Sequence, residues 1–273
     1  MSASAVSTAQ PAAKAVRRAP SLRAILTRAQ GALVVVGLLL AWEASARAGL
    51  INVNLLPAPS AVLVALRDLW DAGMLVDDVT ASVTRVAIGY AIAAALGVAG
   101  GLALGRSPLA ARLLLPIIEL VRPISVIAWI PIAILWFGLG DRPAWFLIAL
   151  GAFFPIFTNA YDAARALPEI YTRVAQCFGA PRGLVIRKVL IPAATPQILT
   201  GLRIGLGAGW ACVIAAELIS ATSGLGYMIQ LARTTIEIEK VLAGMVIIGL
   251  IGFAMNGAML ALERFLVRGA TPR

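Results

Sequence analysis

The sequence has no histidine, few charged residues and only two cysteines. Charged residues make up 13% of its 273 positions and hydrophobic residues 60%, whereas a soluble domain carries about 25% charged residues. Cys177 and Cys212 are too few for a disulfide framework, and without histidine they do not form a zinc or haem site. These shortages exclude a water-soluble domain and a metal centre, and they predict one integral membrane domain.

Lysine is also scarce, and the lysines present exclude a nucleotide site in this chain. A phosphate-binding loop requires Gly-Lys-Ser or Gly-Lys-Thr after a glycine-rich turn. Lys14, Lys188 and Lys240 are followed by Ala, Val and Val. The missing histidine removes the Ser-His and Cys-His pairs of nucleophilic catalysis as well. We therefore expect neither a membrane enzyme nor a bound cofactor.

The excess of basic residues does not indicate a nucleic-acid partner. The net charge is +10, but the 23 Lys and Arg residues are scattered between apolar runs and form no continuous basic face. They indicate orientation instead, because cytoplasmic loops are enriched in Lys and Arg. Basic groups precede the first apolar run, follow the second and the fourth, and return in the tail. With six crossings they all fall on one side, so both termini are predicted to be cytoplasmic.

Long apolar runs are abundant. A spanning helix needs about 20 mostly apolar residues, and six runs qualify, roughly 31–48, 85–105, 114–137, 144–161, 198–219 and 241–262. The fold class is predicted as all-α, a polytopic membrane bundle of six transmembrane helices. This domain covers 31–268, and a largely disordered cytoplasmic tail covers 1–30.

The first apolar run has a second interpretation, a cleaved secretory signal. A signal peptide and its cleavage site have the same order of features as the start of this chain. Here they are a basic leader, the run ALVVVGLLLAW and then ASA at 44–46. Cleavage would leave five spans and an outer amino terminus. The length of the leader and the position of Glu43 just before the cut favour an uncleaved first span.

A shorter amphipathic helix is expected between the first two spans. The segment LPAPSAVLVALRDLW at 56–70 places Leu63, Leu66, Leu69 and Trp70 on one helical face. An apolar face with an aromatic edge suits the outer surface of a membrane. We interpret this helix as a stabilising collar.

The segment RVAQCFGAPRGLVIRKVLIP at 173–192 is basic and is interrupted by glycine and proline, unlike the apolar runs on either side of it. Apolar residues at helical spacing predict a short helix from Pro168, and Gly179 suits the left-handed residue that ends it. Pro181 can begin a second short helix, which Pro192 is expected to end. The result is a cytoplasmic hairpin at about 165–192 with an apolar stripe, Tyr171, Val174, Ala175 and Phe178. It either docks a partner or covers the inner surface of the bundle.

The hairpin resembles the EAA loop of ABC importer permeases. That loop reads E-A-A, three residues, G, nine residues, I-x-L-P. Here the pattern is Arg173-Val174-Ala175, three residues, Gly179, nine residues, and VLIP at 189–192. The spacing is kept, but Arg173 stands where the family has Glu. The resemblance implies that the ATPase contacts are Arg173, Val174, Ala175, Phe178, Gly179, Ala180, Pro181 and Arg182.

The resemblance extends over about residues 50–268. Six blocks are similar to the nitrate, sulfonate, taurine and bicarbonate branch of these permeases, at 56–62, 122–140, 153–159, 167–180, 191–219 and 223–229. It implies the fold of type I ABC importers and a homodimer in the cell inner membrane. It also implies two ABC ATPase subunits that bind ATP and Mg, and a periplasmic or lipid-anchored solute-binding protein. The expected cargo is a small anion of the nitrate, taurine or alkanesulfonate kind.

The third apolar run supplies the first candidates for the substrate pathway. Freed carbonyl groups beside a proline are tolerated where protein or water covers them, so this run is expected to face the bundle interior. Arg122, Ser125 and Trp129 share one helical face at three- and four-residue spacing. Arg122 either attracts an anion or pairs with Glu119. The prolines of this run are Pro116, Pro123 and Pro131.

The fifth run carries two further candidates, Trp210 and Glu217. Ionisable groups inside a span are costly and often functional, so Glu217 is either a gate residue or a paired structural carboxylate. Gly201, Gly205 and Gly209 repeat every four residues, which predicts close helix packing. The segment SGLGYMI at 223–229 is expected to turn into a short outer helix.

A transporter or channel that works without ATP remains the alternative function. Such proteins often show internal repeats or charged relays within their spans. The sequence has no evident repeat and few residues that could form a relay, which favours the importer permease.

Overall fold

The structure is a computed structural model that describes residues 22–268, except the side chains of 22–32, 169, 172, 176, 182, 220, 267 and 268. Residues 1–21 of the predicted tail lie outside the described residues. The chain divides between Pro59 and Ser60 into two units. The first unit contains α1 (Leu22–Arg47), which overlaps the first predicted span and begins earlier, within the predicted tail.

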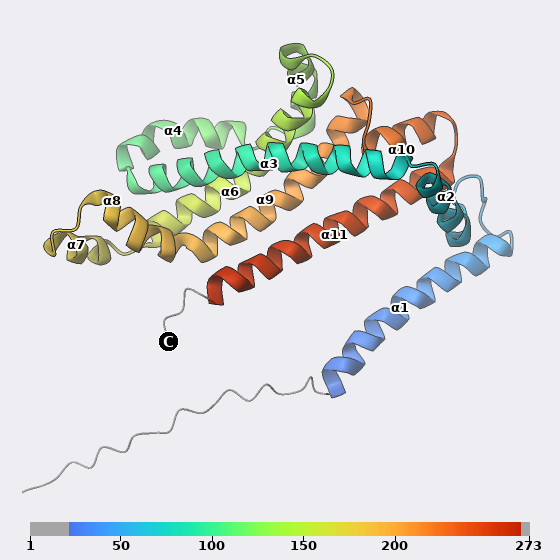
Figure 1. Cartoon of the computed structure of the whole chain (residues 1–273), viewed down its shortest axis with the longest axis horizontal. Coiled ribbons are helices and arrows are strands. Elements are labelled where there is room, and N and C mark those ends of the chain that lie inside the picture. The colour runs from blue at the N-terminus through green and yellow to red at the C-terminus, as the bar shows by residue number, and fades with distance from the viewer. Residues whose placement is uncertain (1–21, 269–273) are drawn as a thin grey trace, which may run out of the picture. The chain divides into compact units, whose positions relative to one another are not determined.

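Every regular element among the described residues is a helix, which confirms the all-α class. After α1 the order is α2 (Pro59–Asp71), α3 (Met74–Arg106), α4 (Pro108–Val121), η1 (Val126–Trp129), α5 (Ile130–Phe137), α6 (Asp141–Ala166), α7 (Glu169–Cys177), α8 (Arg182–Val185), η2 (Ile186–Leu190), α9 (Ile191–Ser220), α10 (Leu225–Thr234) and α11 (Ile238–Arg268). In Figure 1 the long helices of the second unit, α3, α6, α9 and α11, run alongside one another, with α7 and α8 at one end and α2 and α10 at the other.

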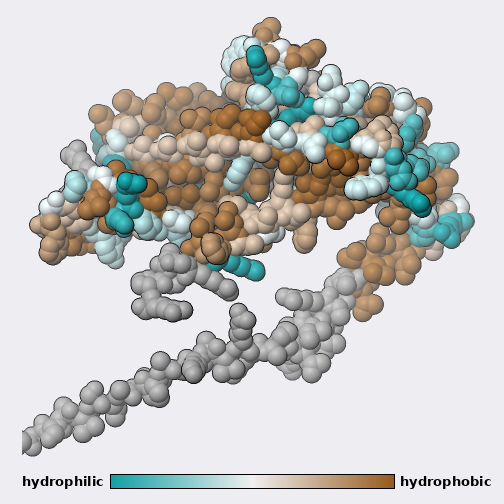
Figure 2. Space-filling model, viewed as in Figure 1, coloured by the Kyte–Doolittle hydropathy of each residue, from teal (hydrophilic) through white to brown (hydrophobic). Residues whose placement is uncertain are grey.

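Among the described residues, four helical segments have the length and hydropathy to cross a membrane. They are Met74–Arg106, Asp141–Ala166, Gly183–Ile219 and Ile238–Leu266. The pair Pro108–Val121 and Val126–Phe137 adds a fifth if it counts as one span. These five segments contain the last five predicted spans. The second unit begins at Ser60. Figure 2 shows hydrophobic residues over most of its visible face, with hydrophilic residues gathered near its ends and beside α5.

Helix α6 packs closely against both α3 and α9 because those helices present glycine to it. A Cβ atom at Gly101 of α3 would lie 2.6 Å from the Cβ of Ala160, and one at Gly205 of α9 would lie 2.6 Å from Cγ1 of Ile156. The packing role predicted for the α9 glycines is confirmed. A second stripe, which the sequence analysis missed, lies on α3 at Gly89, Gly97, Gly101 and Gly105.

The third predicted span is not one helix. Helix α4 ends at Val121, and the chain turns by 90° before η1 and α5. Pro123 cannot donate the next helical hydrogen bond, and Ser125 has an extended backbone with φ −57° and ψ 134°. Arg122, Ser125 and Trp129 therefore do not share a helical face. Most large apolar side chains of α4 are exposed, whereas Ile130 and Ala133 of α5 are buried, so within one chain only the second half of this run packs against the bundle.

Helix α2 is present, and it buries a face in the protein besides the face predicted for the membrane surface. Val62, Ala65 and Leu69 are buried and join the main hydrophobic core, whereas Leu63 and Trp70 are 68% and 62% exposed. The core face follows the spacing i, i+3 and i+7 from Val62. Small Ala65 was overlooked because it adds little hydrophobicity to the pattern.

We expect Gly101→Ala and Gly257→Ala to change stability in opposite directions. A Cβ at Gly101 meets α6, and overpacking costs about 1–3 kcal/mol. Gly257 on α11 has no atom within 4 Å of its Cβ position, so alanine there should stabilise the helix by up to about 1 kcal/mol. Thermal unfolding of the purified chain in detergent micelles measures both. Equal shifts would show that α3 and α6 are not in close contact.

Candidate functional site

The predicted cytoplasmic hairpin is formed by α7 and α8 at one end of the bundle (Figure 1). Gly179 has φ +75°, the left-handed conformation expected of a residue that ends a helix. The N–H of Ala180 donates to the carbonyl oxygen of Ala175 at 3.0 Å. This is the 6→1 hydrogen bond of a Schellman motif. The turn between the two helices is therefore built as the sequence predicts.

The apolar stripe of α7 faces away from the described chain. Tyr171, Val174 and Phe178 are 57%, 46% and 87% exposed, and Ala175 is half-buried. Exposed apolar residues of this size in one patch are typical of an interaction surface. Of the two interpretations of the hairpin, the exposure favours docking of a partner. Arg173 and Pro181 are also exposed, whereas the Arg182 side chain lies outside the described residues.

Pro192 does not end the second helix of the hairpin, contrary to expectation. The chain is helical from Arg182 through the π-helical segment η2 into α9, and Pro192 lies in the first turn of α9. A proline in a first turn removes an N–H that has no helical acceptor there, and a π-helical turn shifts the bonding pattern ahead of it. The hairpin is thus continuous with a long span.

Two of the predicted pathway residues, Arg122 and Ser125, line one hollow. Its volume is about 490 Å³, and its walls also include Thr158 and Asn159 of α6 and Ile204 of α9. Thr158 and Asn159 each donate one hydrogen bond to a carbonyl of their own helix. Asn159 keeps a second N–H, and Arg122 is exposed. A guanidinium, a hydroxyl and an amide together offer donors to an anion.

The two tryptophans predicted for the pathway lie elsewhere. The Trp129 ring packs edge-on against Phe146, with ring centroids 6.3 Å apart. Trp210 is 7% exposed, and its indole N–H donates to the carbonyl oxygen of Ile248 on α11 at 3.1 Å. Both rings contribute to packing between elements in this chain.

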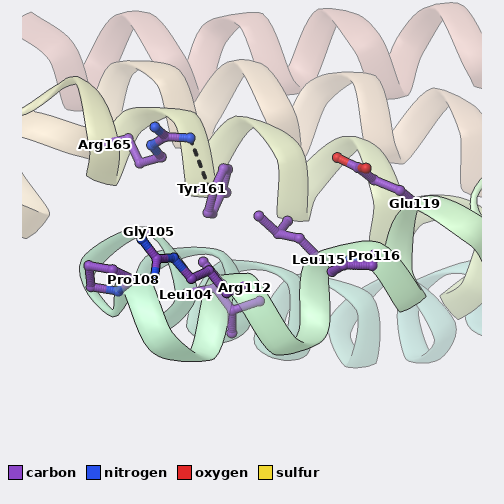
Figure 3. A pocket seen from close by; sticks show the side chains of 10 residues that line it. Leu104, Gly105, Pro108, Arg112, Leu115, Pro116, Glu119, Tyr161 and Arg165 are labelled. Atoms are coloured by element: carbon purple, nitrogen blue, oxygen red, sulfur yellow. Dashed lines mark hydrogen bonds between the residues drawn. The ribbon is translucent and has the colours of Figure 1, made fainter.

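A second hollow of about 500 Å³ separates α4 from α6 (Figure 3). Glu119 lies toward one end of it, and Arg165, over the Tyr161 ring, lies toward the other. Arg165 donates to the Tyr161 hydroxyl at 3.1 Å. Glu119 and Arg122 are exposed and do not pair with each other. Because ionisable groups within spans face water or protein and not lipid, this face of α4 and α6 is the best candidate for the pathway.

Glu217 lies in a buried polar network where α3, α6, α9 and α10 meet. Its side chain is 0% exposed. Nη1 of Arg85 donates to Oε1 at 2.7 Å, the Ser82 hydroxyl donates at 2.8 Å, and the Gly226 N–H donates to Oε2 at 2.9 Å. A buried carboxylate with a cation and several donors is satisfied. This is the geometry of a paired structural carboxylate.

Arg85 connects Glu217 to the outer surface. Its side chain is 6% exposed, and its Nε donates to Oδ1 of Asp141 at 2.7 Å, where the Asp141 side chain is 54% exposed. Its two terminal nitrogens donate to the carbonyl and hydroxyl oxygens of Ser223 at 2.6 and 2.8 Å. The planar guanidinium can satisfy several acceptors at once, so one side chain ties the first turn of α6 to α9 and to the loop before α10.

The start of α10 is held by side chains of the same network. Three consecutive N–H groups, at 224–226, donate to Asp78, Ser82 and Glu217 at 2.8–2.9 Å. Gly224 has φ +109°, and a Cβ there would lie 2.5 Å from Oε1 of Glu217. Only glycine fits, which explains the SGLG sequence before the helix. The short helix predicted after 223 is confirmed as α10, while its location on the outer side stays a prediction.

Sequence reasoning found Glu217 but missed its partners. Asp78, Ser82 and Arg85 follow one another at i, i+4 and i+7 on α3, and this polar face in an otherwise apolar helix was the available signal. Asp141 gave no such signal, because it meets Arg85 across 56 positions of sequence.

Comparison with known proteins agrees with the geometry. Residues 88–268 match the family described as "Binding-protein-dependent transport system inner membrane component". The chain is 39% identical over 244 residues to the taurine transport system permease protein TauC of Escherichia coli (strain K12), covering 88% of each. It is 33% identical over 256 residues to the putative aliphatic sulfonates transport permease protein SsuC of Bacillus subtilis (strain 168), covering 94% of this chain and 92% of the relative.

Two further comparisons concern a third solute and the fold. The bicarbonate transport system permease protein CmpB of Synechococcus elongatus is 34% identical over 189 residues, covering 69% of this chain and 68% of the relative. A solved structure titled "Inward facing conformations of the MetNI methionine ABC transporter" superposes with a TM-score of 0.58 at 20% identity. It covers 74% of this chain and 98% of the matched chain, so the fold of α3 to α11 is shared.

We expect Glu217→Gln to destabilise the chain more than Glu263→Gln. Glutamine replaces one carboxylate oxygen by an NH2 group, so a buried donor, Arg85 or the Gly226 N–H, loses its acceptor at a cost of about 1–3 kcal/mol, while Arg85 keeps its bond to Asp141. Glu263 accepts from Arg203 at 3.3 Å, but both side chains are partly exposed, at 25% and 32%, and such pairs contribute about 0–1 kcal/mol. Thermal unfolding in micelles compares the two variants. Similar losses would mean that Arg85 is not buried with Glu217.

Proposed function

This chain belongs to the family of binding-protein-dependent transport system inner membrane components, and we propose that it carries a small oxyanion of the sulfonate type. It is the multi-pass inner-membrane permease subunit of an ABC importer. The observation that carries the proposal is the hollow lined by Arg122, Ser125 and Asn159. Its hydrogen-bond donors lie on the face of α4 and α6 that we propose as the pathway because Glu119 and Arg122 are exposed there.

The donor set of this hollow suits a sulfonate better than a cation or an apolar solute. Arg122 supplies a permanent positive charge with a fork of N–H groups. The nearest acid on the same helix, Glu119, is not paired with it, so the charge of Arg122 is not neutralised within this chain. Relatives are named for taurine, aliphatic sulfonates and bicarbonate, and each of these solutes carries an oxyanion.

Energy is proposed to come from partner subunits. No Gly-Lys-Ser or Gly-Lys-Thr sequence occurs in the chain, so ATP and Mg would bind to two ABC ATPase subunits, each docked on the exposed stripe of one α7–α8 hairpin. A second copy of this chain would close the pathway face as a homodimer. A periplasmic or lipid-anchored solute-binding protein would deliver the solute, and both termini would be cytoplasmic.

The continuity of the hairpin with α9 suggests how ATPase motion reaches the pathway. Helix α8, the π-helical segment η2 and α9 form one helical path from Arg182 to Ser220. That path passes Ile204 at the hollow and ends beside Glu217 in the outer network. A displacement of the hairpin would therefore shift Ile204 at the hollow and change the contacts between Glu217 and the start of α10. Such a motion is consistent with alternating access.

We expect Arg122→Gln to lower solute uptake by about tenfold or more, because one charge-assisted hydrogen bond contributes roughly 1.5–3 kcal/mol. The assay is uptake of labelled taurine or an alkanesulfonate into vesicles with the full transporter and its binding protein. Arg67→Gln is the control, because Arg67 is 82% exposed on α2 away from the hollow. Equal losses of uptake in the Arg122 and Arg67 variants, or no loss in either, would contradict the proposed path.

We expect Gly179→Val to abolish ATPase activity stimulated by the loaded binding protein, while the permease still enters the membrane. Gly179 has φ +75°, which a β-branched residue rarely adopts, so the turn between α7 and α8 would change shape. Gly183→Val is the matched control, since Gly183 has ordinary helical geometry and open space around its Cβ position. Stimulated activity in the Gly179 variant at the level of the control would exclude the hairpin as the coupling element.

A further inference from the structure

A third hollow lies between α3, α5 and α6 and differs from the other two in its lining. It has a volume of about 470 Å³, and nine of its ten lining residues are apolar or aromatic: Ile92, Ala93, Leu96, Phe137, Trp145, Phe146, Ala149, Leu150 and Phe153. The tenth is Arg142. We call this hollow the apolar slot. Its lining excludes a polar solute, so it is not part of the proposed pathway.

We propose that the apolar slot binds one acyl chain of a membrane glycerophospholipid whose phosphate contacts Arg142. Arg142 is exposed and pairs with no acid among the described residues. It lies in the first turn of α6, next to Asp141, whose contact with Arg85 places this turn beside the network that the charge distribution assigns to the outer side. An unpaired arginine at the mouth of an apolar slot complements a lipid phosphate in charge and position.

The depth of the slot matches one leaflet of a bilayer. From Arg142 to Phe153 the axis of α6 extends about 16 Å at 1.5 Å per residue. The hydrocarbon core is about 30 Å thick, so one leaflet contributes roughly half of that. An acyl chain whose phosphate lies beside Arg142 would thus reach the bottom of the slot near Phe153. Trp145 lies near the mouth, at the level where tryptophan is enriched in membrane proteins.

A helix of a second copy of the chain is a less complementary occupant of the slot. An apolar helix would leave Arg142 at the rim without the anion that its position favours. An extended hydrocarbon chain is the narrower occupant.

The test uses the transporter complex, stripped of lipid, in maltoside micelles. Dibrominated phosphatidylglycerol and dibrominated diacylglycerol are added, and quenching of Trp145 is measured as the difference from a Trp145→Phe complex. The wild type should be quenched at about tenfold lower concentration of the phosphate-bearing lipid, because a charge-assisted hydrogen bond to Arg142 is gained. Arg142→Gln should abolish this preference and leave diacylglycerol quenching unchanged.

Two further variants separate the slot from unspecific lipid contact. Ala149→Leu places extra volume in the slot and should weaken quenching by both lipids, whereas Arg67→Gln on α2 should change neither. A preference for phosphatidylglycerol that survives Arg142→Gln would overturn the proposal. So would the absence of Trp145-dependent quenching by either lipid, or a disulfide between two copies carrying Leu96→Cys, which would show that the second copy occupies the slot.

Discussion

The close approach of α3 and α9 to α6 is the constraint on which the rest of the structure depends. Glycine on both outer helices removes the side chains that would otherwise hold the three axes apart. In a membrane, where lipid is as apolar as leucine, such tight van der Waals contact is a main source of helix association. Because the three helices are close along their length, Arg85 of α3 can reach both Asp141 and Glu217 at their outer ends.

The breaks in helical structure separate the parts of the chain that pack from those that are available to partners. Helix α4 ends at the turn around Pro123 and leaves most of its apolar surface exposed. The π-helical segment η2 has the opposite effect, since it lets the hairpin continue into α9. Pro123 thus follows the end of a helix, whereas Pro192 is accommodated within a continuous helical path. The local hydrogen-bond pattern, and not the presence of proline, decides between these outcomes.

The sequence predicted what depends on local pattern and on hydrophobic length. The spans, the left-handed Gly179 and the packing of Gly201, Gly205 and Gly209 follow from periods and residue sizes. It failed where the answer depends on contacts between distant segments. Asp141 is adjacent to Arg85 only in the folded chain, and the bend at Pro123 separates side chains that a continuous helix would align. The roles of the pathway and coupling residues stay predictions.

The exposed side chains of the spans divide the surface into two kinds of face. Arg122 and Glu119 are exposed within the third span, and ionisable groups there require water or protein beside them. The slot between α3, α5 and α6 has a single charge, Arg142, and that charge lies at its mouth. We propose that charges within a span identify a surface that water or protein covers in the assembled transporter, and that a charge only at the rim of an apolar slot identifies a surface in contact with lipid. On this proposal the position of its arginines distinguishes the face that the chain presents to solute from the face that it presents to the membrane.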